Sequence, residues 1–280
     1  MSFKNFVPVA LAKKINEELS RDLVFYQNVN HDYEGIAKEI GDKVKILNAG
    51  KPTILTYSDG ALHQITPETL QGSSIMLPID HVAEFAFKVG DIDKAIAAGN
   101  LFSVYMNEAK EGIQDTMDSF IAGLAADKNA KVNAKTGSAV TDQNVLGWVD
   151  ECIDDLLLND VKPSTEITIT GSPKFCRLVK RAYRELDTNN HGLLANGVLG
   201  GYDFATLKMS NNVLTRDESG TVYEYVQIKT NRAIAFAKPY VHTEPYRDHE
   251  TWEDCVNGYA LFGGVLVRPK EMVVLKVKYA

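Results

Sequence analysis

The clearest alternation of apolar and polar positions lies in the middle of the chain. Apolar side chains recur there at steps of three or four residues, at Phe102, Met106, Ala109, Ile113, Met117, Phe120 and Leu124. Acidic, basic and amide side chains occupy the positions between them, which predicts an amphipathic helix of ~35 Å. The methionine and aromatic stripe of this helix favours core packing over a cofactor site.

A different pattern precedes this helix. A short helix is predicted over residues 8–19, and alternation with a period of two then predicts strands within residues 41–89. Turn-forming residues interrupt that second stretch, at Gly50, Pro52, Asp59, Gly60, Pro67 and Gly72. The stretch has too few apolar residues for a core of its own. We therefore predict a long β excursion that orders when a partner covers it, through Ile54, Leu55, Tyr57, Leu62, Ile65 and Leu70.

Helix and strand alternate after the long helix. A helix is predicted over residues 142–160, with acidic residues and no Lys or Arg, followed by a strand at 166–170. Ser172 and Pro173 then suit the N-cap and first position of a second helix. That helix carries Lys174, Arg177, Lys180, Arg181 and Arg184. Such a basic run is usually a solvated face, and the alternative is contact with the acidic helix of the same or a neighbouring copy. The contact candidates are Asp150, Asp154, Arg177 and Arg181.

The glycines between Gly197 and Gly201 raise the question of a phosphate-binding loop. A P-loop or a dinucleotide fingerprint requires a fixed glycine spacing before a helix, whereas these glycines precede the strand-like YDFATLKM. We interpret them as a tight bend, and residues 216–220 as the turn of the next hairpin.

Composition excludes several classes of function. The chain has 280 residues, of which 45% are hydrophobic, so it can bury a sizeable core in one domain or two subdomains. Its net charge of -7 argues against tight nucleic-acid binding. Its opening residues form no signal sequence and no window reaches the length of a membrane span, which predicts a cytoplasm-like compartment.

Cysteine and histidine give no candidate catalytic or metal site. Cys152, Cys176 and Cys255 occur singly, which predicts buried, unreactive thiols. The histidines lie far apart, except for His242 and His249, whose spacing around a proline suits no helical metal site. The sequence therefore predicts no enzyme, no cofactor and no metal, with an unrecognised enzyme as a remote alternative.

A resemblance spans nearly the whole chain. Its strongest parts are GVLGGYDFATLKMSNNVL, VQIKTNRAIAFAKPYV and TEPYRDHETWEDCVNGYALFGGVLVRPKEMVVLKV, preceded by VNHDYEGIAKEIGDKVKIL and FAFKVGDIDKAI. In their order and spacing these stretches resemble the major capsid (coat) proteins of tailed double-stranded-DNA bacteriophages, in the branch of the Salmonella podoviruses. The resemblance implies the α+β Hong Kong phage capsid fold.

That fold implies five segments. Residues 1–40 would form an N-terminal arm and 41–89 an extended β-hairpin loop. Residues 90–134 would form a peripheral domain with a long spine helix, and 135–239 an axial domain with a mixed sheet and flanking helices. Residues 240–280, with strands at 265–267 and 273–277, would return to the peripheral domain.

The resemblance also implies a function and partners. The protein would be a structural virion protein that assembles in the host cytoplasm, as hexamers and pentamers, into an icosahedral head shell. It would enclose DNA without sequence-specific binding and without a membrane. A portal protein and a decoration protein are candidate partners. A separate scaffolding protein is a third candidate, because no scaffolding-like segment precedes the arm. We predict no cross-link. An encapsulin-type shell of a cellular nanocompartment is the alternative.

Overall fold

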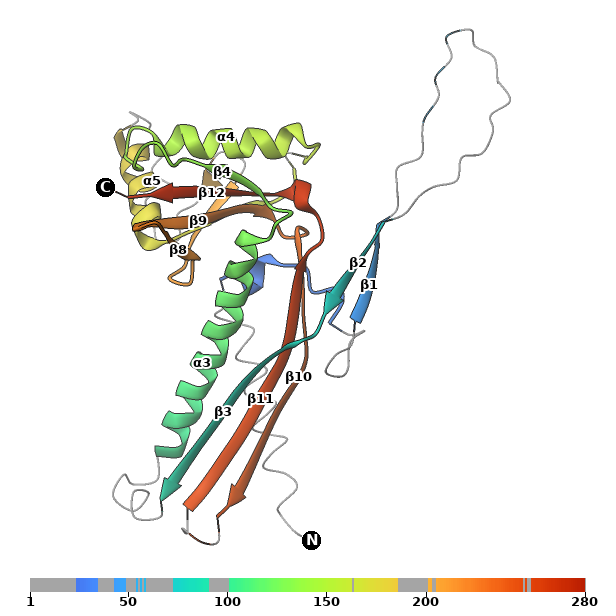
Figure 1. The fold of residues 1–280 in the computed structure, drawn as a ribbon, viewed down its shortest axis with the longest axis vertical. Helices are drawn as coiled ribbons and strands as arrows, with labels where there is room; N and C mark the ends of the chain where they lie inside the picture. The colour runs from blue at the N-terminus through green and yellow to red at the C-terminus, as the bar shows by residue number, and fades with distance from the viewer. Residues whose placement is uncertain are drawn as a thin grey trace.

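The computed structural model describes residues 24–34, 43–48, 54, 56, 58, 73–90, 101–162, 164–185, 201–202, 205–248, 250 and 253–279. The helix predicted over residues 8–19 lies outside these ranges. The described residues form an α+β fold with two bodies, a long one built on a helix and a narrow sheet, and a compact one built on a wider sheet (Figure 1).

The long body pairs one helix with three antiparallel strands. Its elements are α3 (Leu101–Gly123), β3 (His81–Gly90), β10 (Ile234–Arg247) and β11 (Glu253–Leu266), with the strands in the order β10-β11-β3. The long amphipathic helix predicted from the sequence is thus confirmed. Helix and sheet share one apolar core, which includes Ile113, Met117, Ile121, Phe236, Val256 and Phe262.

The compact body is a seven-stranded sheet covered on one face by two helices. The strand order is β4-β12-β9-β5-β7-β6, with β8 paired to β9. The elements are β4 (Lys131–Ala134), α4 (Val145–Leu158), β5 (Ile167–Gly171), α5 (Pro173–Glu185), β6 (Gly201–Tyr202), β7 (Ala205–Met209), β8 (Thr215–Glu218), β9 (Thr221–Thr230) and β12 (Met272–Lys278). Between sheet and helices lies a second core, with Val149, Leu156, Ile169, Phe175, Ile228 and Leu275.

Several local predictions are confirmed. The Phe175 backbone N–H donates to the Ser172 hydroxyl at 3.2 Å, so Ser172 caps α5 as expected. Ser219 and Gly220 have positive φ angles of 55° and 81° and turn the chain from β8 into β9, so the turn is shorter than the predicted range 216–220, whose first three residues belong to β8. Of the glycine cluster, Gly201 begins β6, whereas Gly197 and Gly200 lie outside the described residues.

The three thiols are buried and free, as predicted. Burial raises the pKa of Cys152 to about 12 and that of Cys176 to about 12. Both side chains therefore stay protonated near neutral pH and serve as small apolar groups.

Two of the predicted strands are placed by pairing with distant segments. β3, which ends the excursion predicted over residues 41–89, pairs with β11 along its whole length, and its Phe85 and Phe87 pack on the core beside α3. β12, which contains the strand predicted at 273–277, lies between β9 and β4 in the wide sheet. The reason is that β12 is apolar on both faces, and only an inner strand of a sheet with two covered faces buries both.

The two bodies meet around the segment 24–34. Its 3₁₀ turn, η2 (Tyr26–Asn28), lies beside the upper end of α3 and below the wide sheet (Figure 1). Phe25 is fully buried in the core that α3 shares with the long sheet. Asn30 forms a parallel bridge with Ala235 of β10. The segment therefore contributes core side chains and is not a loose arm over this range.

The helix α4 offers a matched pair of leucines for testing the compact core. Leu156 is 0% exposed and Leu158 is 82% exposed. We expect Leu156→Ala to lower the free energy of unfolding by ~2–5 kcal/mol, because it removes buried methyl groups and leaves a cavity. Leu158→Ala should change it by less than ~0.5 kcal/mol. Urea denaturation followed by circular dichroism measures both, and equal losses would contradict the packing described above.

Candidate assembly surface

A two-stranded hairpin projects from the end of the long sheet. β1 (Lys43–Asn48) and β2 (Ser73–Pro78) pair in antiparallel register, from Lys43 opposite Pro78 to Asn48 opposite Ser73. β2 leads directly into β3, so the hairpin shares a continuous chain with the long sheet (Figure 1). Residues 49–72 connect its two strands.

The inner face of this hairpin is clamped to the long sheet by a small core of its own. This core contains Val44, Ile46, Leu77, Ile79, Ala235, Ala237, Leu261 and Val267. In β1 the buried residues alternate with exposed ones, as expected for a strand with one covered face. The base of the hairpin therefore has a defined direction relative to the sheet.

Gly263 of β11 allows the closest approach in this clamp. A Cβ atom at Gly263 would lie 1.9 Å from the carbonyl oxygen of Pro78 and 3.0 Å from the Cα of Ile79. Backbone atoms cannot move aside as a flexible side chain can, so this position requires glycine. Backbone packing against backbone thus sets the angle at which the hairpin leaves the body.

The outer face of the hairpin carries exposed apolar and basic side chains. Lys43 and Lys45 are exposed on β1, together with Leu47, which is 75% exposed. On the same face of β2, Met76 is 50% exposed. Of the predicted contact residues, Ile54 is 83% exposed. The other five, Leu55, Tyr57, Leu62, Ile65 and Leu70, lie outside the described residues.

The charged helices of the compact body are partly neutralised within the chain. On one flank of α4, Asp155 pairs with Lys131 at 2.9 Å and Glu151 pairs with Lys135. The Lys135 ammonium lowers the pKa of Glu151 below its usual value. Arg181 of α5 bonds Asp142 at 3.0 Å, just before α4 begins. For Arg181, contact with the acidic segment thus occurs within one copy.

The remaining predicted charges face outward. Asp150 and Asp154 on α4 are exposed, as is Arg177 on α5. Asp154 and Arg177 form no ion pair with any other residue in the described part of the chain. The structure therefore brings α4 and α5 together at one end of the compact body and leaves Asp154 and Arg177 exposed, without an ion-pair partner among the described residues.

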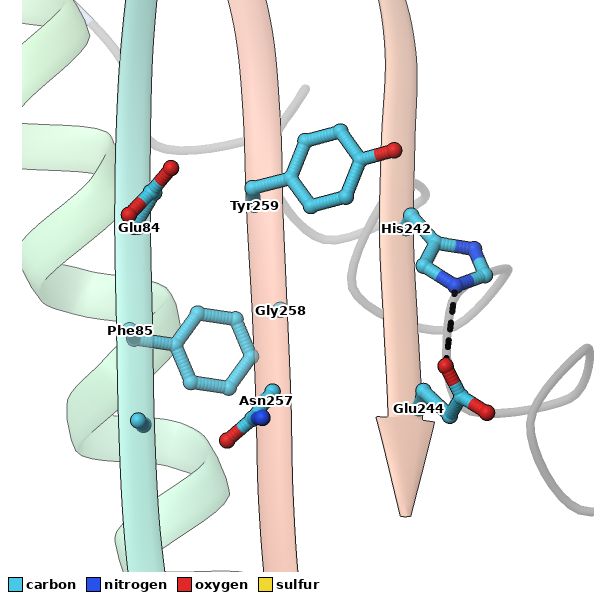
Figure 2. A pocket seen from close by; sticks show the side chains of 8 residues that line it. Glu84, Phe85, His242, Glu244, Asn257, Gly258 and Tyr259 are labelled. Atoms are coloured by element: carbon cyan, nitrogen blue, oxygen red, sulfur yellow. Dashed lines mark ion pairs between the residues drawn. The ribbon is translucent and has the colours of Figure 1, made fainter.

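A hollow lies on the long sheet (Figure 2). Glu84 and Phe85 come from β3, Asn257 and Tyr259 from β11, and His242 and Glu244 from β10. The Nε2 atom of His242 lies 3.8 Å from a carboxylate oxygen of Glu244. The lining includes no Ser, Thr, Cys or Lys side chain that would act as a nucleophile.

Within the described ranges, no group of three or more His, Cys, Asp or Glu side chains is placed to hold a metal ion. None of the helices in those ranges is both long and apolar enough to cross a membrane. His249, the neighbour of His242 in sequence, lies outside the described residues.

Solved structures with the same architecture come from phages, and several of them are described as capsids. A structure from Mycobacterium phage Che8 superposes with a TM-score of 0.73 at 23% identity and covers 91% of each chain. The capsid of the cyanophage P-SCSP1u gives a TM-score of 0.68 at 13% identity, over 87% of this chain and 85% of that one. The chain has a phage-capsid fold. No family model matches the sequence, and no curated protein matches it.

The phage-capsid fold extends to particles of other origin. A virus-like particle from Pyrococcus furiosus gives a TM-score of 0.59 at 13% identity and covers 98% of this chain and 100% of that one. The α+β Hong Kong phage capsid fold expected from the sequence is thus confirmed. The Salmonella-podovirus branch and the five segment boundaries stay predictions.

The clamp predicts a specific effect of a single methyl group. We expect Gly263→Ala to lower the free energy of unfolding by ~1–3 kcal/mol, because the new Cβ would overlap the backbone of Pro78 and force the hairpin off the sheet. Gly112→Ala in α3 is the matched control, since its Cβ would meet nothing within 4 Å. It should leave stability unchanged or raise it by up to ~1 kcal/mol. Urea denaturation measures the free energy of unfolding of both variants. A Gly263→Ala protein as stable as the wild type would contradict the clamp.

Proposed function

We propose that this protein is the major capsid protein of a tailed bacteriophage and builds the icosahedral shell around the double-stranded DNA genome. The observation that carries the proposal is the match to phage capsid subunits over about nine-tenths of both chains. Further support comes from the capsids of phage XM1 and of bacteriophage PhiM1, which share the fold. The role is structural and non-catalytic.

The projecting hairpin supports assembly by repetition. A monomer leaves Leu47, Met76 and Ile54 in water, although each is a large apolar side chain. A second copy that covers them would remove this exposed surface at every interface around a closed ring. We propose that residues 41–80 reach over a neighbouring subunit, with Leu55, Tyr57, Leu62, Ile65 and Leu70 as further contact residues.

The partners follow from the shell. The main partner is the protein itself, in hexamers and pentamers, and a portal protein, a separate scaffolding protein and a decoration protein are the further candidates. The net charge of -7 suits a shell that encloses DNA without binding its phosphates tightly. The long body corresponds to the peripheral domain and the compact body to the axial domain of such subunits.

A cellular compartment shell is the alternative. The virus-like particle from Pyrococcus furiosus matches 98% of this chain, so the fold alone suits either role. The contents of the particle distinguish the two roles, because a phage head packages DNA and a cellular compartment packages cargo protein.

The first test of the proposal is assembly of the purified chain. We expect rings, shells or tubes in electron micrographs, with the chain alone or with its scaffolding protein. Replacement of residues 50–71 by a short Gly-Ser linker should abolish or severely reduce these particles, because the residues proposed to contact a neighbouring subunit would be missing. Thermal unfolding of the subunit should stay cooperative, since both cores lie outside the replaced residues.

Two outcomes would contradict this assignment. A compact monomer at high protein concentration under all salt conditions, with or without scaffolding protein, would argue against a shell protein altogether. Normal particles from the linker variant, or a linker variant that no longer folds, would instead argue against the assembly role of residues 50–71.

A second prediction concerns the outward charges of the compact body. We propose that Asp154 of one copy faces Arg177 of a neighbouring copy. Arg177→Glu and Asp154→Arg should each raise the protein concentration needed for assembly by ~5-fold or more, because like charges would then meet. Subunit stability should change by less than ~0.5 kcal/mol, since both side chains are exposed.

The double variant and a distant control sharpen this test. Combining Arg177→Glu with Asp154→Arg should restore part of the assembly, because the two surfaces then exchange charge. Lys128→Glu, an exposed reversal in the turn after α3, is the matched control and should assemble normally. Light scattering across a salt series measures assembly, and single reversals without effect would exclude this contact.

A further inference from the structure

The face of the wide sheet that meets segment 24–34 is unusually polar. Along β9, Val226 and Ile228 point to the helices α4 and α5, whereas Tyr225, Gln227 and Lys229 occupy the opposite face. Gln227 and Lys229 are both 0% exposed. Their neighbours on β5 are buried threonines, with Thr168 opposite Lys229 and Thr170 opposite Gln227. A buried polar layer therefore separates the two bodies.

This layer is incompletely bonded. The Gln227 amide donates to the carbonyl oxygens of Ile121 and Ala122, at the end of α3. Its own Oε1 atom and the Thr170 hydroxyl have no hydrogen-bond partner among the residues that the structure describes. Unsatisfied buried polar atoms cost stability, and native proteins contain few of them.

Lys229 is the most costly member of the layer. Its Nζ atom donates to the backbone carbonyl of Asn28 in η2. A charged ammonium carries three donors, yet Lys229 has this one acceptor and no carboxylate partner among the described side chains. Another cation, Lys208 of β7, acts on Lys229 and donates to the Asn28 side-chain oxygen at 2.7 Å. A buried charge without a counter-charge is strongly unfavourable.

Burial and the neighbouring Lys208 lower the pKa of Lys229 to about 7. Two lysines of the wide sheet thus converge on a single residue of the N-terminal segment, and one of them is poised to change charge near neutral pH.

Other titrating groups hold the rest of the segment. The Asp118 carboxylate of α3 accepts from the Tyr26 backbone N–H at 3.4 Å, and burial raises its pKa to about 6. His31 faces the Glu34 carboxylate at 3.0 Å and the Tyr26 carbonyl at 2.8 Å. Burial opposes the charge on His31, but the bonds to Glu34 and Tyr26 outweigh it and raise its pKa.

Two further groups belong to this set. Lys238 of β10 lies 5.1 Å from the centre of the Tyr26 ring, and burial lowers its pKa. Burial and Glu34 raise the pKa of the Tyr26 hydroxyl far above neutral pH.

We propose that Lys229 makes the docking of residues 24–34 on the wide sheet a proton-controlled step. The segment docks while Lys229 is neutral and is released when Lys229 binds a proton. Release would free the residues that precede the projecting hairpin and would loosen the contact between the two bodies. The proposal goes beyond the shell function and does not depend on it, because it concerns the isolated subunit.

The expected pH dependence has a definite sign. In the released segment Lys229 has its ordinary pKa of about 10.5, and in the docked segment a pKa of about 7. Between these values the released state binds more protons, so docking strengthens as pH rises. The opening constant should fall about tenfold per pH unit between pH ~7.5 and ~9.5 and level off below pH ~6. His31 acts in the opposite direction, and Lys238 in the same direction.

Comparison with a variant isolates the contribution of Lys229. Hydrogen exchange of the full-length subunit, followed by mass spectrometry of the peptide covering residues 24–34, reports the opening constant at each pH. Lys229→Met keeps the approximate size of the side chain and replaces the titratable amine by a group that cannot bind a proton. The ratio of wild-type to variant opening constants cancels the intrinsic exchange rate, and it should fall about 100-fold from pH 7.5 to pH 9.5.

Lys208→Met is the matched control. It removes a bond to the same Asn28 but leaves the titrating Lys229 in place, so its opening constant should still fall steeply as pH rises. The fall should begin at a higher pH than in the wild type, because Lys208 contributes to the low pKa of Lys229. Wild-type and Lys229→Met curves that run parallel would overturn the proposal.

A measurement on the wild type alone covers the case of a Lys229→Met protein that does not fold. The peptide 24–34 should then show a pH-dependent opening that a peptide from β11 lacks. Identical pH dependence in both peptides would show that the segment opens only with global unfolding, and would also overturn the proposal.

Discussion

One constraint organises this protein: a single sheet must serve two cores. β9 and β12 lie side by side in the middle of the wide sheet, and side chains on both of their faces are buried. On one face Val273 and Leu275 pack under α4 and α5, and on the other Met272 and Val274 pack toward α3. Because apolar burial on both faces is available only to inner strands, the last strand of the chain must enter the centre of the compact body. The long body is then attached to that same strand by its own core.

The segment 24–34 completes this arrangement. It fills the angle between α3, the wide sheet and β10, with Phe25 in the core and Asn28 and Asn30 bonded to strands of different sheets. The apolar part of the segment belongs to the long body and the polar part touches the compact body. The junction therefore combines a firm attachment on one side with a weaker, polar contact on the other.

How much of this was predictable depends on how local the information is. The helix α3 could be read from its period of 3.6, and the start of α5 from Ser172 and Pro173, because these signals act within a few residues. The place of β12 could not be predicted from the sequence, since its pairing with β9 and β4 depends on distant segments. The need for glycine at Gly263 arises from contact with Pro78, and the burial of Lys229 from contact with Asn28. Neither contact leaves a pattern in the local sequence. The predicted contact residues of the loop remain predictions, whereas the intrachain partner of Arg181 came from the structure.

The attachment of Gln227 to the last carbonyls of α3 has a mechanical consequence. Because its amide bonds both Ile121 and Ala122, the end of the helix cannot slide along the wide sheet without breaking two hydrogen bonds. The long body, packed along this helix of ~35 Å, is then a lever that is attached to the wide sheet at one end. A rotation of ~5° at the junction would carry its far end through ~3 Å, by the geometry of a rigid rod of that length. A change too small to disturb either core would thus reposition the distal end of the subunit by nearly the diameter of a water molecule.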